Sequence, residues 1–548
     1  MIYIIGFIVL LGLLVLAHEL GHFLMGKLCK VKIEAFAMGF GKPLLKKKYG
    51  ETEYRLCMIP LGGYVKFVGD DPEKDAPVPA EIKPFTFAEQ KLWKRTLIVF
   101  AGPAFNFILA VALFAVVYFV GEPNIAPNIG YVEKGSIAYD SGIKEGDQIV
   151  TINGKNINIW GDIDEVLGKS TAMEASVVVK RGSEEKTLSV KLKSLLSRNR
   201  YGEPVYKNSI QGIAPYKTSS MIGVNDTTSI AYKAGFKTGD LIVSADSTEI
   251  RSWEELNKYL AQHRGEIKFK VKRFVDRKDK KAKDKELEIV LNNNGSGKLG
   301  FYPSELFVMG FTKDKSPAKD AGIVENDRIV AVNRKEIGSF FTLQQTVDEA
   351  GRESKNIELT VERNGKLLKY NISPGLQKVE TLGAKEKRFL LGIETDFAAG
   401  PVVEKKVIVR NPFKLIVVAI EKTLMWMWIT LVGLFKLCTG AVSLKAVGGP
   451  IMIGKIAGDS LLLGIAYFFR IAAVISINLG IINLVPIPVL DGGHLMFFGI
   501  EAIIRKPVKE KYQIVAQQVG FYILIGLVAL SFFNDFMNFG SGILRFFK

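Results

Sequence analysis

The sequence predicts a multi-domain membrane protein, with an α-helical core of four transmembrane spans and external α+β domains. Three observations support this fold class: long apolar runs near both ends, a polar region between them, and a pattern that occurs three times in that region. Hydrophobic residues make up 48% of the 548 residues and charged residues 24%. This mixture is typical of membrane segments joined to ordinary polar domains, and the length exceeds that of one domain.

Four segments each come near the ~20 residues that cross the hydrocarbon core of a bilayer. They are 1–25, 97–120, 465–500 and 517–534. The first has no basic residues before it and no small-residue cleavage site after it, so we expect a retained span and not a removable signal peptide.

Basic residues predict the orientation of these spans. The loop after the first span carries Lys46, Lys47 and Lys48, and the loop at 505–511 before the last span is also basic. By the positive-inside rule both loops face the cytoplasm, which places the N-terminus, region 121–410 and the C-terminus outside. Many basic residues flank apolar runs, so the net charge of +17 favours membrane lipids over nucleic acid as the partner.

Segment 414–438 is predicted to be an interfacial helix. Its apolar core, 423–435, has only 13 residues and is flanked by charges, which is short for a span. A fifth span would also move the 505–511 loop outside.

A repeated pattern organises the external region. Ser136, Ser229 and Ser316 each begin a short helix that ends at a glycine and is followed by a turn and a β-branched strand. The copies are separated by 93 and 87 residues, which is the size of a domain.

The pattern resembles the core of a PDZ domain, and PDZ domains bind an extended peptide as an added strand. We expect PDZ-like units at 121–215, 216–300 and 301–380. The glycine-containing strands at 129–131, 222–224 and 309–311 are expected to form the groove floors. Whether each copy binds a peptide or protein ligand or only packs is left open.

The pentapeptide 18–22, His-Glu-Leu-Gly-His, predicts a metal site. On a helix His18 and His22 share one face and can bind a single zinc ion, while Glu19 can act as general base. The chain has only four histidines, and ionisable groups in an apolar helix are costly and usually functional.

The third metal ligand is predicted far away in the chain. Residues 23–31 contain no Asp, Glu or His, whereas Asp491 lies in an apolar segment. Two prolines, Pro486 and Pro488, and a glycine pair break the helix there, which membranes tolerate where the backbone lines a cavity. A His₂Asp set suits Zn²⁺.

These motifs together resemble the site-2 protease family of intramembrane zinc metalloproteases, and within it the bacterial regulator-of-sigma-E type. The resemblance covers nearly the whole chain. It rests on 18–22 and 483–494, on the glycine-rich stretches 39–41 and 59–66, and on 101–106, 448–451 and 533–536.

The resemblance implies a role for each matching residue. His18, His22 and Asp491 would ligate zinc, and Glu19 would activate the water. Substrate-binding residues would be Asn483, Gly62, Gly63, Pro486 and Pro488. A membrane-associated β-hairpin at 35–67 would hold the substrate extended beside the zinc.

The family also implies the setting: a bacterial cytoplasmic membrane, and a single-pass membrane substrate such as an anti-sigma factor or a signal-peptide remnant. The expected layout is 1–120 for the first two spans, 381–460 for an external linker with the interfacial helix, and 461–548 for the last two spans. Three PDZ-like repeats depart from the two that the family's relatives carry.

Two other functions remain open. One is a membrane-anchored PDZ scaffold with a structural or vestigial zinc site, although Glu19 is not needed for binding metal alone. The other is a metal transporter, although the chain lacks the several polar spans that line a transport path. The three cysteines form no CxxC and indicate no disulfide framework.

Overall fold

The computed structural model describes residues 2–69, 78–198, 204–273, 284–295, 299–312, 315–381, 384–395, 399–440, 442 and 447–543. The chain divides into two compact units. One comprises residues 1–123 and 406–548, and the other residues 124–405.

The first unit is helical apart from one hairpin. Its elements are α1 (Ile2–Leu28), β1 (Ile33–Tyr49), β2 (Thr52–Phe67), the 3₁₀ turn η1 (Lys83–Phe85), α2 (Leu92–Val120), α9 (Pro412–Cys438), α10 (Pro450–Leu463), α11 (Ile465–Asn483), α12 (Asp491–Ile504) and α13 (Glu510–Ile543). Two short strands, β3 (Glu122–Ile125) and β28 (Glu404–Val407), pair where the chain passes from this unit to the other.

The apolar core of this unit lies around α2. Leu14 of α1, Phe114 of α2 and Ile477 of α11 are almost fully buried in one cluster. Five helices among the described residues, α1, α2, α9, α11 and α13, are long and apolar enough to cross a membrane by length and composition.

Helix α9 is longer than the sequence analysis expected. It runs unbroken for 27 residues, and an 18-residue window within it has a mean hydropathy of 1.8, so the length argument for an interfacial helix does not hold. The Thr430 hydroxyl donates a hydrogen bond to Asn478 of α11 (2.7 Å), and Trp426 packs against the core cluster. The four-span count and the interfacial position stay predictions that rest on charge parity.

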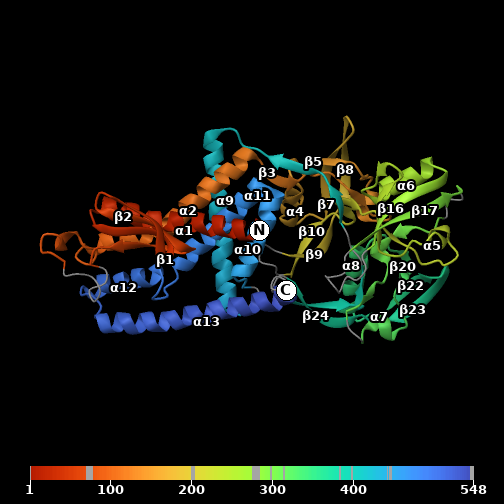
Figure 1. Cartoon of the computed structure of the whole chain (residues 1–548). Coiled ribbons are helices and arrows are strands. Elements are labelled where there is room, and N and C mark those ends of the chain that lie inside the picture. The colour runs from red at the N-terminus through yellow and green to blue at the C-terminus, as the bar shows by residue number, and fades with distance from the viewer. Residues whose placement is uncertain are drawn as a thin grey trace. The chain divides into compact units, whose positions relative to one another are not determined.

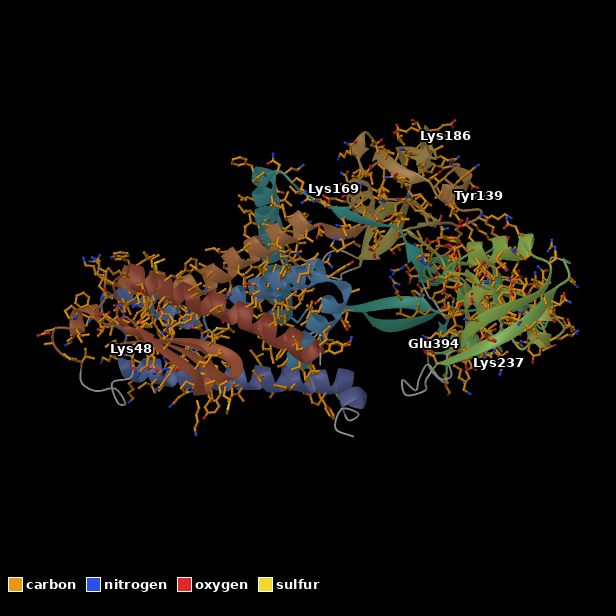
Figure 2. All side chains as sticks on the ribbon, turned by 45° about the horizontal axis from the view of Figure 1, so that its top comes forward. Lys48, Tyr139, Lys169, Lys186, Lys237 and Glu394 are labelled. Atoms are coloured by element: carbon orange, nitrogen blue, oxygen red, sulfur yellow. The ribbon has the colours of Figure 1, made fainter. Side chains whose placement is uncertain are left out.

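Strands β1 and β2 form one antiparallel hairpin beside α1 (Figure 1). Near α1 the hairpin is buried, with Ile33 and Ala35 inaccessible to solvent. Its far half is exposed and carries both apolar and basic side chains. Leu44, Leu45 and Tyr49 are exposed there, and so is Lys48, which Figure 2 labels. Such a surface suits contact with lipid headgroups and the outer acyl chains.

Asp535 of α13 holds the start of α10. Its buried carboxylate accepts hydrogen bonds from the backbone N–H groups of Gly449 (2.9 Å), Ile451 (2.8 Å) and Met452 (3.2 Å). It therefore satisfies donors that a helix N-terminus leaves free.

The second unit contains three similar α+β modules, one for each sequence repeat. The first module contains β4 (Tyr131–Val132), α3 (Ile137–Asp140), β5 (Gln148–Ile152), β6 (Lys155–Asn156), α4 (Trp160–Gly168), β7 (Glu174–Arg181), β8 (Glu184–Lys191), β9 (Lys193–Arg198), β10 (Pro204–Ser209), β11 (Ile213–Ala214) and β12 (Tyr216–Thr218).

The second module contains β13 (Met221–Gly223), α5 (Ile230–Lys233), β14 (Asp240–Ala245), β15 (Thr248–Glu249), α6 (Trp253–Gln262), β16 (Gly265–Arg273), β17 (Lys285–Asn293) and β18 (Tyr302–Pro303). The third contains η2 (Ser304–Leu306), β19 (Gly310–Phe311), α7 (Pro317–Asp320), β20 (Arg328–Val332), β21 (Lys335–Glu336), α8 (Phe340–Arg352), β22 (Ile357–Arg363), β23 (Lys366–Ile372), β24 (Gly375–Thr381), β25 (Ala384–Leu390), β26 (Ile393–Glu394) and β27 (Ala399–Val402).

Equivalent strands pair in the same order in each module. The sheets run β6-β5-β7-β8, β15-β14-β16-β17 and β21-β20-β22-β23, all antiparallel. Each module has its own buried cluster, with Ile149, Ile242 and Ile329 at equivalent fully buried positions. The three serines that begin the repeats cap their short helices through their side chains.

A buried ion pair recurs in all three modules. Arg181 donates two hydrogen bonds to Asp147 (both 2.7 Å), and the aspartate is completely buried. The same bidentate pair occurs as Arg273 with Asp240 and as Arg363 with Asp327. Each arginine also donates to the carbonyl of the glycine that ends the short helix, so one side chain joins the helix to the sheet.

Candidate metal centre

Three predicted ligands meet in the helical unit, from helices far apart in sequence. His18 Nε2 lies 3.2 Å from Asp491 Oδ2 and 3.2 Å from His22 Nε2, and His22 Nε2 lies 3.6 Å from Asp491 Oδ1. Ligand atoms about 2.0–2.1 Å from a tetrahedral zinc lie roughly 3.3 Å from one another. The spacing of the two histidine nitrogens and the Asp491 carboxylate therefore fits a single zinc ion.

The chemistry of the donor set also fits a metal. The Oδ2 atom of Asp491 is buried and makes no hydrogen bond among the described residues, although His18 approaches it outside hydrogen-bond geometry. A buried carboxylate oxygen without a donor is costly unless a cation satisfies it. Three ligands from the protein leave a fourth position open for water or substrate, as in catalytic zinc sites.

His22 is oriented by the backbone of α2. Its Nδ1 lies 2.9 Å from the carbonyl oxygen of Ile98, so the Nδ1–H donates there and Nε2 is left for a metal. His18 has Asn106 of α2 as its neighbour, with the side-chain amide 3.1 Å from Nδ1.

Glycines let α1 and α2 approach closely at this point. A Cβ on Gly21 would lie 2.2 Å from the carbonyl oxygen of Ala101, and a Cβ on Gly102 would lie 2.3 Å from His22 Nε2. The helix backbone at Gly102 thus forms a wall against the two histidine rings. This close packing explains why the 101–106 motif of the sequence contains a small residue at Gly102.

Glu19 lies on α1 between the histidines and the hairpin. Its carboxylate accepts a hydrogen bond from the Val65 N–H and is close enough to His18, His22 and Asp491 to interact electrostatically. Gly63 of β2 packs against the Glu19 side chain, since a Cβ there would lie 3.0 Å from its Cγ. The hairpin is therefore in direct contact with the predicted catalytic base.

The other predicted substrate-binding residues lie at differing distances from this centre. Asn483 ends α11 with its amide nitrogen 3.4 Å from His18 Nε2. Gly62 lies in β2 at a φ of +108°, a backbone conformation that favours glycine, and faces the Phe40 ring. Pro486 is exposed and Pro488 half-buried in the loop that breaks α11 from α12.

That loop folds back over the first turn of α12. A Cβ on Gly492 would lie 2.3 Å from the carbonyl oxygen of Val485, and one on Gly493 would lie 2.4 Å from that of Ile487. Asp491 therefore begins a helix whose start is fixed by the preceding loop. Arg95 of α2 and Glu501 of α12 form a 2.5 Å ion pair, with both side chains less than one-fifth exposed, and hold the two helices together.

Sequence reasoning missed two residues of this centre, Asn106 and Ile98. The Ile98 contribution is a backbone carbonyl and has no side-chain signal. Asn106 carried a signal, because an amide inside an apolar span is costly and usually functional.

Comparisons with known proteins agree with this geometry. The model of peptidase family M50 matches residues 6–527. A protein of Vibrio cholerae named "Putative zinc metalloprotease" is 32% identical over 97% of this chain and 98% of its own length. The regulator of sigma-E protease RseP of Escherichia coli is 31% identical over 97% of both chains, and the regulator of sigma E protease of Haemophilus influenzae is 31% identical over 97% and 98%.

A solved PDZ domain protein from Parabacteroides distasonis covers 46% of this chain at 12% identity, and its TM-score of 0.11 is too low to support an argument. The family match and the relatives span almost the whole chain. The protein is therefore a metalloendopeptidase of peptidase family M50, the site-2 protease family.

Proposed function

We propose that the protein cleaves single-pass membrane proteins within the bilayer, using zinc held by His18, His22 and Asp491. The observation that supports this most directly is the 3.2 to 3.6 Å spacing of the two histidine Nε2 atoms from each other and from the Asp491 carboxylate, beside a carboxylate at Glu19. Zinc bound there would polarise the scissile carbonyl and supply a nucleophile at neutral pH.

Glu19 would take the proton from the attacking water and pass it to the leaving amine. The hydrogen bond from the Val65 N–H orients this carboxylate. Asn483 at the end of α11 would donate to the substrate backbone. Pro486 and Pro488 would shape the loop against which the substrate lies.

The hairpin would keep the substrate extended. A peptide bond inside a helix is closed off by its own hydrogen bonds, and pairing with a strand edge removes that protection. Gly62 and Gly63 lie on β2, and Gly63 contacts Glu19, so a strand added beside β2 would run next to the catalytic base.

The relatives' names suggest a sigma-E regulatory role, so an anti-sigma factor is the first substrate to test, with signal-peptide remnants as the second. We place the protein in the bacterial inner membrane. In the proposed orientation, unit 124–405 lies outside the cytoplasm and the zinc lies near the cytoplasmic side of the membrane. The three α+β modules would act as PDZ-like units that bind peptide or exclude bulky substrates, with boundaries near 121–215, 216–300 and 301–380.

The test is cleavage of a tagged single-span substrate in membranes by wild type and Glu19→Gln, with zinc measured in both. Loss of a general base lowers such rates roughly 10²–10⁴-fold. We expect that loss with zinc retained. The control is Glu89→Gln, which removes an exposed carboxylate on the loop before α2. This variant should cleave the substrate as fast as the wild type. Equal cleavage by Glu19→Gln and wild type would contradict the proposed mechanism, and no cleavage by either would contradict the proposed class of substrate.

A further inference from the structure

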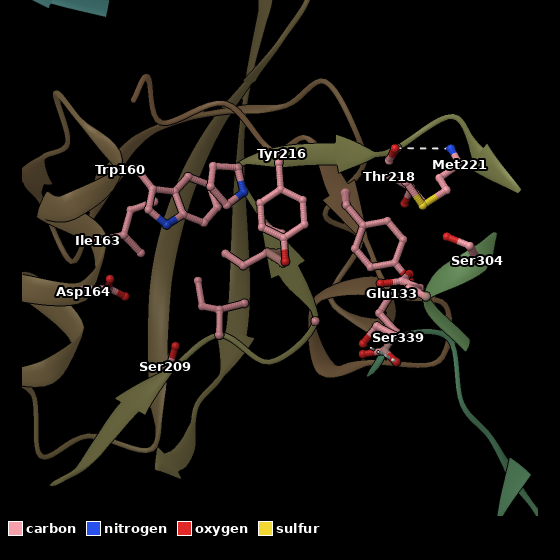
Figure 3. A pocket seen from close by; sticks show the side chains of 18 residues that line it. Glu133, Trp160, Ile163, Asp164, Ser209, Tyr216, Thr218, Met221, Ser304 and Ser339 are labelled. Atoms are coloured by element: carbon pink, nitrogen blue, oxygen red, sulfur yellow. Dashed lines mark hydrogen bonds between the residues drawn. The ribbon is translucent and has the colours of Figure 1, made fainter. Parts of the chain in front are cut away.

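A cavity of about 210 Å³ lies within unit 124–405, between the first module and residues of the other two modules, among them Glu305 and Ser339 (Figure 3). One side is formed by α4, through Trp160 and Ile163, and the other by residues 209–216. Cavities also lie beside the corresponding helices of the other two modules, between α6 and residues 299–302 and between α8 and residues 390–395. The cavity beside α6 is also lined by Glu362 and Gly365 of the third module. We refer to the three cavities as the first, second and third grooves.

The first groove differs from the others in its charge. Its described lining includes three carboxylates, Glu133, Asp164 and Glu305, and neither lysine nor arginine, in a chain of net charge +17. The second groove has two carboxylates, Asp226 and Glu362, but also Arg264, and the third has one, Glu394, among mainly apolar side chains such as Leu343. Three aromatic residues, Tyr131, Trp160 and Tyr216, complete the first groove.

Glu133 already has partners. It is buried and accepts hydrogen bonds from the backbone of Gly338 (3.2 Å) and the hydroxyls of Ser339 and Thr342, at the N-terminus of α8. Its charge is stabilised by that helix end.

Glu305 has no such partner among the described residues. No hydrogen bond or ion pair reaches its carboxylate, and burial together with the charge of Glu133 raises the pKa of Glu305 to about 7. A half-buried carboxylate beside a second one is stabilised when a cation approaches. The groove thus lacks the positive charge that would balance it.

The backbone of the groove can accept an extended chain. Within the described residues β11 belongs to a two-stranded sheet and pairs only with β4. Its other edge is free to add a peptide strand between β11 and α4, the way in which PDZ domains bind ligands.

We propose that this groove binds an extended peptide through a lysine or arginine side chain, which enters the cavity and pairs with Glu305 among the rings of Tyr131, Trp160 and Tyr216. Aromatic faces attract a cation and also pack against its aliphatic stem. A free C-terminal carboxylate is disfavoured, because three acidic groups would repel it. The inference rests on the proposed peptide-binding role of the modules and not on the protease activity.

The experiment uses the full-length Glu19→Gln protein in nanodiscs at pH 8, so that no peptide is cut. Fluorescent heptapeptides with blocked ends differ only at the central residue, which is Arg, Lys, citrulline or Glu. We expect the Arg and Lys peptides to bind about tenfold more tightly than the citrulline peptide, which has Arg's shape without its charge. A photoreactive version of the Arg peptide should cross-link to Trp160 or Tyr216.

Glu305→Gln should abolish the preference for Arg over citrulline. Glu394→Gln is the matched control, since Glu394 is an exposed acid that lines the third groove (Figure 2), and it should leave the preference intact. Equal binding of the Arg and citrulline peptides would overturn the proposal, as would a preference that survives Glu305→Gln. Absence of any peptide binding would overturn both this proposal and the peptide-binding role, while leaving the zinc protease untouched.

Discussion

The side-chain amide of Asn106 lies 3.1 Å from Nδ1 of His18, on the side of the imidazole away from Asp491. The amide oxygen of Asn106 is buried and has no hydrogen-bond partner among the described residues. If Nε2 of His18 binds metal, its Nδ1 carries the proton and needs an acceptor. Turning the amide by 180° supplies that acceptor and gives the buried oxygen its partner.

Asn106→Leu should therefore weaken zinc binding while keeping the shape of the side chain. Loss of such an outer partner costs typically 10–100-fold in metal affinity. Zinc retention against a competing chelator measures this effect. Asn106→Asp keeps an acceptor and should retain zinc. Ser476→Ala, which removes a hydroxyl that donates to the Asn106 carbonyl, is the neighbouring control, and equal zinc loss in it would contradict the idea.

Gly102→Ala should displace the His22 ring, because the added Cβ would lie 2.3 Å from Nε2. The expected result is a folded protein with reduced zinc and little cleavage. Gly12→Ala on α1 is the control, since a Cβ there meets nothing within 4 Å and alanine favours a helix. Zinc analysis of the monodisperse proteins separates displacement of a ligand from unfolding, and full zinc in Gly102→Ala would count against the steric argument.

Arg363→Leu should destabilise the third module strongly. It leaves the fully buried Asp327 without its cation, and removing one partner of a buried pair costs about 3–5 kcal/mol. Limited proteolysis should find new cuts within 301–380. Lys369→Leu removes an exposed ion pair with Glu358 in the same sheet and should change the cutting pattern little.

The stability of unit 124–405 should depend on the ionisation of Glu305. Its pKa is raised from 4.5 in the unfolded chain to about 7, so the folded state binds this proton more tightly. The contribution of this proton to the free energy of unfolding is fully present below pH 4.5. It is lost as the pH rises through 7, which lowers the free energy of unfolding by up to about 3 kcal/mol. Glu305→Gln should therefore raise the thermal unfolding midpoint at pH 8 relative to wild type, and much less at pH 5. Equal shifts at both pH values would contradict this origin.

The cluster of His18, His22 and Asp491 could be predicted because residue type and spacing carry the chemistry. His18 and His22 share a helix face, and Asp491 was found because an acid is conspicuous in an apolar segment. Proline and glycine at 486–493 likewise predicted the break between α11 and α12. Residue type and local spacing were therefore sufficient to predict both the cluster and the helix break.

Pairings over long sequence distances were harder to predict. The arginines of the three buried pairs follow their aspartates by 33 to 36 residues, with no local pattern that joins them. An alignment of the three repeats beyond the glycine turns would have revealed them.

The groove floors were expected at 129–131, 222–224 and 309–311, but the structure lines the grooves mostly with 209–216, 299–302 and 390–395. These strands lie some 80 residues further along the chain, and only tertiary pairing brings them to the grooves.

The ends of unit 124–405 lie together. The N–H of Ala126 donates to the carbonyl of Val403 (2.8 Å), and on the helical side the N–H of Val409 donates to the carbonyl of Tyr118 (3.0 Å). Nearly three hundred residues are thus inserted between two chain positions that are already neighbours. We therefore expect that the inserted residues can be removed and replaced by a few glycines, or exchanged for those of a relative, without pulling apart α2 and α9. Specificity could then change by exchange of whole modules while the membrane catalyst stays the same.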